Sequence, residues 1–250
     1  PLWKPEEPDE PSWESPWGRG RPGWHIECST MASHYLGETI DIHGGGDDLV
    51  FPHHEGEVAQ SECATHTLFS RFWFHTAMLR HQGRKMSKSV GNLVMARDLL
   101  ESFSPDALRL YLCRYHYRES REHDRDELVD AEVLADTLRR GAEAVGGFEG
   151  GEGGEGEEEE AGASDALDPG PEEEALVGRL EDDLDTPAAL DILEVLAERI
   201  LEAAASGQAV SRARERLRAL GKGLFGLRLD DDEPQAEVLE GWERHRCSGQ

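Results

Sequence analysis

Hydrophobic residues recur at helical spacing through most of the second half of the chain. Four segments carry an apolar stripe of period 3.6, which predicts amphipathic helices that share one core. The stripes are Val133, Leu134, Leu138 and Val145; Leu176 and Leu180; Leu190, Leu193, Ile200 and Leu201; and Val210, Leu217 and Leu220. Gly146 and Gly147 would end the first helix, and Thr186-Pro187 would cap the third. The pattern therefore predicts an α-helical bundle over residues 124–228.

The first 123 residues mix short strands with helices, which indicates an α/β arrangement. Alternating or aromatic runs predict strands, and periodic runs with caps predict helices. The predicted helices are 24–36, with Ile26, Met31 and Tyr35 on its apolar side, and 93–103, and a turn leads into a further helix over 49–63. The predicted strands are 39–42 and 72–75, and another helix follows the Ser104-Pro105 cap with Leu108, Tyr111 and Leu112 buried. We expect the aromatic strand at 72–75 to lie in the core.

Three stretches lack such patterns. Residues 149–172 are mainly Gly and Glu, and so few apolar side chains cannot offset the entropy of ordering, so we predict a disordered acidic linker. Residues 229–250 are predicted to form a flexible tail apart from Trp242. Residues 5–23 are rich in Pro, Glu and Trp, which is typical of an extended arm.

The composition is strongly acidic, with a formal net charge of -27 at pH 7 over 250 residues. Residues 1–125 hold 14 Lys and Arg against 19 Asp and Glu, and residues 126–250 hold 12 against 34. Binding to a nucleic acid usually depends on basic residues that displace counterions. The acidic second half would therefore repel a polyanion.

The cysteines and the hydropathy of the chain indicate in which cellular compartment the protein would work. The four cysteines show no disulfide-framework spacing, which suits a reducing compartment. No apolar run approaches membrane length, and no signal-peptide pattern opens the chain. We expect a soluble, cytoplasmic protein without membrane association.

Cys28, His53 and Glu57 offer one sulfur, one nitrogen and one oxygen donor, a mixture that suits zinc. His53 and Glu57 are four residues apart, so a helix would present both on one face, while Cys28 would come from another element. The alternative is that Cys28 is a buried structural thiol, because free cysteine packs like a small hydrophobic residue. The spacing matches no self-sufficient zinc finger, so both interpretations stay open.

Gly44, Gly45 and Gly46 follow the strand predicted at 39–42. Residues without a Cβ allow a phosphate or a flat ring to approach the backbone, and Asp48 could accept hydrogen bonds from a ribose. This pattern is typical of a nucleotide site, but a plain surface turn would look the same.

The pentapeptide Lys85-Met86-Ser87-Lys88-Ser89 is rich in donors for phosphate oxygens, although many Lys-Ser loops are only solvated turns. It resembles the signature loop of class I aminoacyl-tRNA synthetases. The flanking residues 20–29 and 43–57 are similar to the cysteinyl-tRNA synthetase family. The resemblance is specific from Pro1 to about His123 and looser around residues 182–201.

This resemblance implies a fold and a chemistry. The fold would be the C-terminal half of a class I Rossmann-like catalytic domain over residues 1–123, followed by the helical bundle. The family holds one zinc with two cysteines, a histidine and a glutamate, of which Cys28, His53 and Glu57 match three, and the second cysteine lies upstream. The zinc then takes the thiolate of the substrate cysteine, which a serine hydroxyl cannot replace.

The resemblance also implies roles for the remaining candidates. Trp24 and His43 match residues that line the amino-acid pocket. Lys88 matches the ATP-binding lysine, and Lys85 would stabilise the phosphates as pyrophosphate leaves. Gly45, Gly46 and Asp48 would complete the ATP site. The implied partners are cysteine, ATP with Mg²⁺ and tRNA(Cys), and we expect a monomer.

Alternatives stay open on two grounds. The chain starts without Met at a point well inside the family pattern, so we expect a fragment without the N-terminal half, inactive by itself or reduced to a non-catalytic interaction protein. The acidity indicates either a high-salt organism or a relative that does not bind tRNA. A mycothiol-pathway cysteine:glucosaminyl-inositol ligase is favoured by residues 182–187, whereas His43 and Glu57 favour the synthetase.

Overall fold

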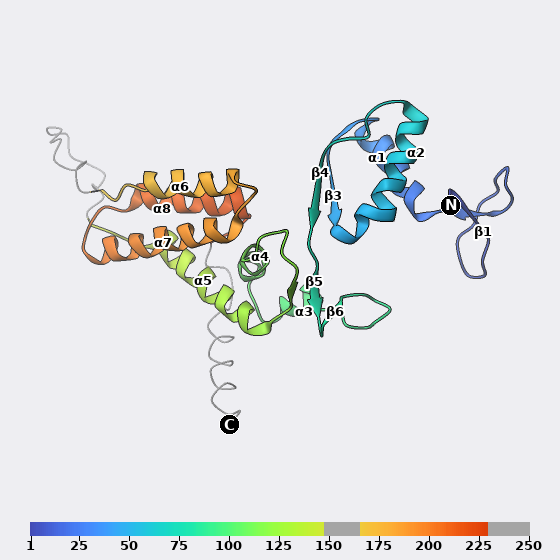
Figure 1. The fold of residues 1–250 in the computed structure, drawn as a ribbon. Helices are drawn as coiled ribbons and strands as arrows, with labels where there is room; N and C mark the ends of the chain where they lie inside the picture. The colour runs from blue at the N-terminus through green and yellow to red at the C-terminus, as the bar shows by residue number, and fades with distance from the viewer. Residues whose placement is uncertain (148–165, 230–250) are drawn as a thin grey trace, which may run out of the picture. The chain divides into compact units, whose positions relative to one another are not determined.

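The computed structural model describes residues 1–147 and 166–229, which fall into two compact units (Figure 1). The first unit comprises Pro1–Met78 with Arg118–Arg121, and the remainder of the chain forms the second. Contacts divide the chain after Met78, because residues that follow it, including Leu110 and Tyr111, pack into the core of the helical unit. The domain boundary expected near residue 123 stays a prediction.

The first unit contains a small βαβ arrangement. Strands β3 and β4 are parallel, with Ile42 opposite Phe72, and helix α2 lies in the connection between them. A parallel pair requires such a crossover. The elements are β1 (Trp3–Pro5), β2 (Gly20–Pro22), α1 (Trp24–Leu36), β3 (Ile40–Gly46), η1 (Asp47–Leu49), η2 (Val50–His54), α2 (Glu55–Thr65) and β4 (Ser70–Thr76).

The two faces of this sheet differ. His43 and Trp73 lie opposite each other on one face, with ring centroids 5.0 Å apart. On the other face Ile42 and Phe72 are 69% and 67% exposed. The strand at 72–75 is confirmed, but the expectation that it lies in the core is wrong: Phe72 and Trp73 are exposed, and Phe74 and His75 are only partly buried. No described residue of the first unit covers the face that carries Phe72.

Helix α1 has the bounds predicted for it, yet its apolar side was wrongly assigned. Met31 and Tyr35 are exposed, and the buried residue of α1 is Ser29. The arm before it is an antiparallel pair, β1 with β2, in which Trp13 bridges to Gly20. Met31 and Trp13 both line an open apolar groove between arm and helix.

The second unit is mainly helical, as predicted. Helices α4 to α8 surround one apolar core, and short strands form a sheet of order β6-β5-β7. The elements are β5 (Leu79–His81), β6 (Arg84–Lys85), α3 (Ala96–Leu99), α4 (Pro105–Cys113), β7 (Arg121–Glu122), α5 (Arg125–Glu143), α6 (Gly170–Glu181), α7 (Thr186–Ala205), α8 (Ser211–Leu220) and η4 (Gly221–Phe225).

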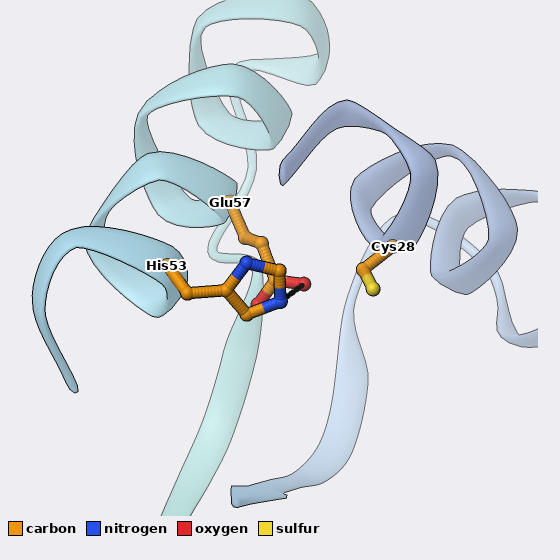
Figure 2. A group of neighbouring side chains, drawn as sticks. All are labelled: Cys28, His53 and Glu57. Atoms are coloured by element: carbon orange, nitrogen blue, oxygen red, sulfur yellow. Dashed lines mark ion pairs between the residues drawn. The ribbon is translucent and has the colours of Figure 1, made fainter. Parts of the chain in front are cut away.

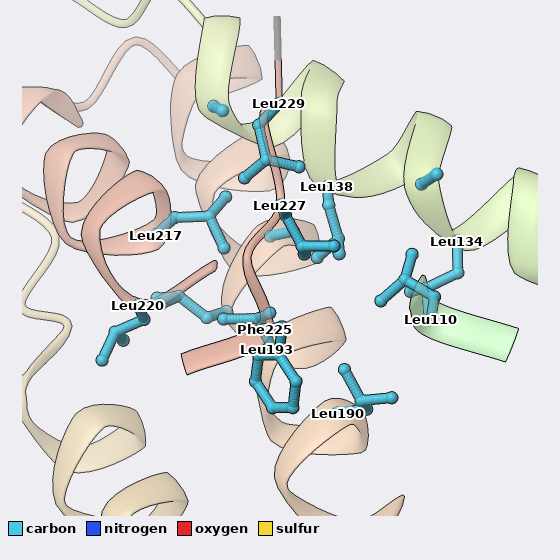
Figure 3. Packing of buried hydrophobic residues seen from close by; sticks show 14 of the residues in the cluster. Leu110, Leu134, Leu138, Leu190, Leu193, Leu217, Leu220, Phe225, Leu227 and Leu229 are labelled. Carbon is cyan, nitrogen blue, oxygen red and sulfur yellow. The ribbon is translucent and has the colours of Figure 1, made fainter. Parts of the chain in front are cut away.

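Leucines from every helix of the bundle meet in this core (Figure 3). Leu134, Leu138, Leu190, Leu193 and Leu217 from the predicted stripes are all buried. Other assignments fail at the edges of the stripes: Leu112, Val133 and Val145 are exposed, and α5 ends before Val145. An apolar residue one position off the stripe points away from the core.

Two helix starts differ in how they are capped. Ser104 caps α4 as predicted, since its Oγ accepts a hydrogen bond from the Ala107 N–H at 3.0 Å. At α7 the cap is Asp185, whose carboxylate accepts from the Ala188 N–H at 3.2 Å, and Thr186 is already helical. Our assignment of the cap to Thr186 is therefore wrong by one residue.

Other predicted boundaries also move. Helix α3 is shorter than the helix predicted at 93–103. Helix α6 begins at Gly170, so the end of the predicted linker is helical, and Leu229, the first residue of the predicted tail, is buried. Residues 149–165 and the tail from 230 onward, with Trp242, lie outside the described residues. Among the helices that the structure describes, none is both long and apolar enough to span a membrane.

Candidate metal and substrate site

Cys28, His53 and Glu57 come from different elements of the first unit and converge (Figure 2). Cys28 lies in α1, His53 lies in the last part of η2, and Glu57 lies in the first turn of α2. The two helices are tied beside the site by a hydrogen bond of 2.8 Å from Ser29 Oγ to Gln60 Oε1. The predicted grouping of the three donors is thus present in the fold.

The donor atoms of these three residues all lie within 4.8 Å of one another. His53 Nε2 is 3.4 Å from Glu57 Oε1, the ion pair drawn in Figure 2. Glu57 is fully buried, and its Oε1 has no hydrogen-bond partner among the described residues. A buried carboxylate oxygen that accepts no hydrogen bond is costly, and a cation bound to it would lower that cost.

The donor set fits zinc by chemistry and by spacing. Ligands of a tetrahedral zinc ion lie about 3.3–3.8 Å apart, so small side-chain adjustments suffice. Burial raises the pKa of the Cys28 thiol, and the Glu57 charge raises it further. Without a cation the thiol keeps its proton, whereas a bound cation favours the thiolate.

A second group, His43, His54 and Glu57, also lies within 4.8 Å, but its atoms are joined by hydrogen bonds. His43 Nε2 is 2.7 Å from Glu57 Oε2, and His54 Nδ1 is 2.8 Å from His75 Nε2. Burial lowers the pKa of His54, and the neighbouring His43 lowers it further, which favours neutral His54. Hydrogen bonds therefore engage the histidines of this second group, which leaves the first group as the better candidate for a metal.

Trp24 and His25 flank the candidate ligand His53. The Trp24 ring stacks on His53 with centroids 4.2 Å apart and planes at 23°. His25 Nδ1 lies 2.8 Å from His53 Nδ1. The sequence interpretation missed His25 and His54 and left the role of His75 undecided. The available signal was the density of histidine, since seven of the eleven lie between residues 25 and 75.

The glycines lie within β3 and not in a turn after it, because the strand continues to Gly46. A Cβ at Gly45 would approach His54 Cε1 to 2.9 Å, and one at Gly46 would approach Asp48 Oδ1 to 2.6 Å. Close packing against these side chains explains the glycines. They stand at the carboxyl end of a parallel strand, where α/β sheets bind ligands.

Lys85 and Lys88 belong to the second unit, whereas the other candidate residues belong to the first. Both lysines are exposed, Lys85 at the end of β6 and Lys88 in the loop after it. Asn92 shapes this loop: its Oδ1 accepts from the Ser87 N–H at 3.0 Å, and its amide donates to the His81 carbonyl at 3.1 Å.

Comparison with known proteins decides the family. Residues 1–133 match the family described as the tRNA synthetases class I (C) catalytic domain. The cysteine–tRNA ligase of Paramagnetospirillum magneticum is 44% identical over 233 residues, which is 93% of this chain and 47% of that protein. The chain belongs to the class I cysteinyl-tRNA synthetase family.

Other members of the cysteinyl-tRNA synthetase family extend this match. The cysteine–tRNA ligase of Thermococcus onnurineus is 54% identical over 130 residues, covering 52% of this chain and 27% of that protein. The chain spans about half the length of the curated relatives that cover most of it.

A solved class I structure is also similar in fold. The LeuRS–tRNA–LeuAMS ternary complex of Agrobacterium radiobacter K84 has a TM-score of 0.57 at 13% identity and covers 96% of this chain and 33% of that chain. The predicted fold, part of a class I catalytic domain followed by an α-helical bundle, is confirmed.

Proposed function

We propose that this chain is part of a cysteine–tRNA ligase, which activates cysteine with ATP and transfers it to tRNA(Cys) in the cytoplasm. The observation in the structure that carries the proposal is the convergence of Cys28, His53 and Glu57 around Glu57 Oε1, which accepts no hydrogen bond among the described residues. Relatives with that name, 44–45% identical over more than nine tenths of the chain, support the choice of amino acid and acceptor.

Cys28, His53 and Glu57 would hold the zinc, together with a second cysteine in the family pattern. When bound, the zinc supplies a soft Lewis acid that favours the thiolate of cysteine over the hydroxyl of serine. The stacked Trp24 ring shields His53 from water. His43 is engaged with Glu57 through Nε2, which leaves its Nδ1 for the amino acid.

The remaining candidates would serve ATP, which binds with Mg²⁺. Gly45 and Gly46 would accept the nucleotide at the end of β3, and Asp48 would bind its ribose. The carboxylate of cysteine attacks the α-phosphate, so no protein nucleophile is needed. Lys85 and Lys88 would stabilise the negative charge that develops as pyrophosphate leaves.

Cysteine-dependent exchange of pyrophosphate into ATP tests the proposal. The assay uses this chain alone and this chain joined to the part of the P. magneticum relative that it does not match. We expect exchange from the joined protein and a loss of about 100-fold or more in its Lys88→Ala variant. Arg97→Ala, an exposed cation away from the signature loop, is the matched control. No exchange at any salt concentration would refute the proposal.

The acceptor is tested separately, because the acidic charge balance opposes tRNA binding. The joined protein is given cysteine, ATP and either tRNA(Cys) or glucosaminyl-inositol. We expect cysteine on the tRNA and none on the sugar. The reverse result would favour the mycothiol-pathway ligase.

A further inference from the structure

Two imidazoles meet at the edge of the candidate metal site. His25 Nδ1 and His53 Nδ1 are 2.8 Å apart, with ring centroids at 5.0 Å. Two ring nitrogens at this distance form a hydrogen bond only if one carries a proton and the other presents a lone pair. The pair therefore fixes the two tautomers relative to each other.

The direction of this bond follows from the other edge of His53. Its Nε2 lies 3.4 Å from Glu57 Oε1, which accepts no hydrogen bond among the described residues and belongs to the group that includes Cys28. A histidine that binds a metal through Nε2 must carry its proton on Nδ1. His53 then donates to His25 Nδ1, and His25 must carry its own proton on Nε2.

Packing holds His25 in place to accept this bond. Its ring lies against the backbone of α2, where a Cβ on Gly56 would approach His25 Cγ to 3.2 Å. The Trp24 ring stacks on His25 with centroids 5.5 Å apart and planes at 29°. The acceptor is thus preorganised by α2 and by a neighbouring aromatic ring.

We propose that His25 is a positioning residue, which holds His53 in the tautomer and orientation that present Nε2 to the metal. The proposal depends on the metal site of the proposed function. Partners of ligating histidines are often carboxylates or carbonyls. A neutral imidazole performs the same task without adding negative charge to a site that already holds Cys28 and Glu57, which leaves the charge of the cation to attract a substrate thiolate.

Metal affinity of the whole chain tests this proposal without measuring activity. His25→Phe keeps a ring but removes the acceptor, whereas His25→Asn offers Oδ1 close to the position of Nδ1. We expect His25→Phe to bind Zn²⁺ and Co²⁺ about 10–100-fold more weakly than wild type. His25→Asn should recover most of that loss. His34→Phe, an exposed histidine on the same helix, is the matched control and should leave affinity unchanged.

Spectroscopy separates positioning from general damage to the fold. At saturating Co²⁺ the thiolate-to-cobalt band of Cys28 should appear in all variants, with unchanged helical circular dichroism. Long-range ¹H–¹⁵N spectra of the Zn²⁺-bound chain should show the proton of His53 on Nδ1 and that of His25 on Nε2, because in the metal-free chain the Glu57 carboxylate itself favours a proton on His53 Nε2. Any one of four results would overturn the proposal. Two concern wild type, namely a proton on His53 Nε2 of the Zn²⁺-bound chain or no Co²⁺ binding. The other two concern the variants, namely equal metal affinity of His25→Phe and wild type, or failure of His25→Asn to recover affinity. Absence of pyrophosphate exchange with these metal results intact would refute the proposed function alone.

Discussion

The two units bury different kinds of side chain. The helical unit has 26 buried apolar residues in one cluster, whereas Ile40 and Phe69 are the buried apolar residues described in Pro1–Met78. What the first unit buries instead is polar: Ser29, His53, His54, Glu57, Ser61 and Ser70. Apolar burial is the main source of folding stability. The comparison indicates that the second unit holds most of the apolar core, whereas the first buries the candidate metal ligands His53 and Glu57.

The exposed sheet face sharpens the contrast. Parallel sheets are normally covered on both faces, and Ile42 and Phe72 lie open on one of them. The buried Glu57 carboxylate adds a cost that a cation would remove. We therefore expect the first unit to depend on metal for stability and the second to be indifferent to it, because ligand binding to the folded state contributes folding free energy.

Separate optical signals make this comparison measurable. Five of the six tryptophans lie at positions 3, 13, 17, 24 and 73, in the first unit, and the long helices lie in the second. Trp242 falls outside the described residues, and Trp242→Phe removes its signal. Fluorescence then reports on the first unit, and circular dichroism at 222 nm reports mainly on the second.

The largest effect is expected from a cavity in the helical core. Leu193 in α7 is fully buried, and Leu193→Ala should lower the free energy of unfolding of the second unit by about 2–5 kcal/mol. Urea unfolding followed by circular dichroism measures it. Val195→Ala, at a position 47% exposed on the same helix, is the control and should change stability by less than about 0.5 kcal/mol. Equal losses in both variants would contradict the assigned core.

Zinc should act on the other unit. At a free concentration 100-fold above its Kd, a ligand of the folded state adds about 2.7 kcal/mol. We expect zinc to raise the unfolding midpoint seen by tryptophan fluorescence and to leave the circular dichroism transition unchanged. Glu57→Gln should abolish the shift, whereas Glu62→Gln, on the same helix but outside the donor group, should retain it. A shift of both transitions would mean that the units do not differ in this way.

The difference between the two units also explains which features could be predicted from the sequence. The stripe residues Leu138 and Leu193 and the Ser104 cap were predicted because helix periodicity and capping are local properties of the chain. The donors Cys28, His53 and Glu57 were found by their chemistry. Their hydrogen-bond partners were not, because the contacts His25–His53 and His43–Glu57 join residues 28 and 14 positions apart and depend on how α1, β3 and α2 pack.

The sequence pattern also could not predict which apolar side chains of the first unit are exposed to solvent. Met31 and Phe72 have the spacing of buried residues, yet both are exposed. Hydrophobic periodicity shows which side chains share one face of a helix or strand, but not whether another element covers that face. Gly45 and Gly46 were singled out for a nucleotide site, and that role stays a prediction. Close atoms belong to His54 at Gly45 and to Asp48 at Gly46, and this packing appears only once β3, η1 and η2 are folded together.

A moderate effect is expected from the cap of α7. Asp185→Ala removes the acceptor for the Ala188 N–H and should destabilise the second unit by about 1 kcal/mol. The Asp185 ion pair with Arg179, at 3.8 Å and partly exposed, should add little. Thr186→Ala is the matched control, since its side chain caps nothing, and should be close to neutral in urea unfolding. A larger loss from Thr186→Ala would restore the cap assigned from the sequence.

The smallest effect tests charge on the helical unit. Burial raises the pKa of Glu194 in α7, as do Glu198 and Asp191, while Arg114 at 3.9 Å opposes them. Because the folded pKa lies above the unfolded value near 4.5, the folded state binds this proton more tightly, and its contribution to stability is lost as pH rises through the folded pKa.

Glu194→Gln mimics the protonated carboxyl, so it should raise the urea midpoint of the second unit at pH 7 and leave it unchanged at pH 4. The gain should stay below about 0.5 kcal/mol, because Glu194 is 35% exposed and solvent screens its charge. Glu202→Gln, at an exposed position on the same helix, controls for the general loss of one negative charge from an acidic chain. Equal gains in both variants would show that net charge, and not burial of Glu194, sets the pH dependence.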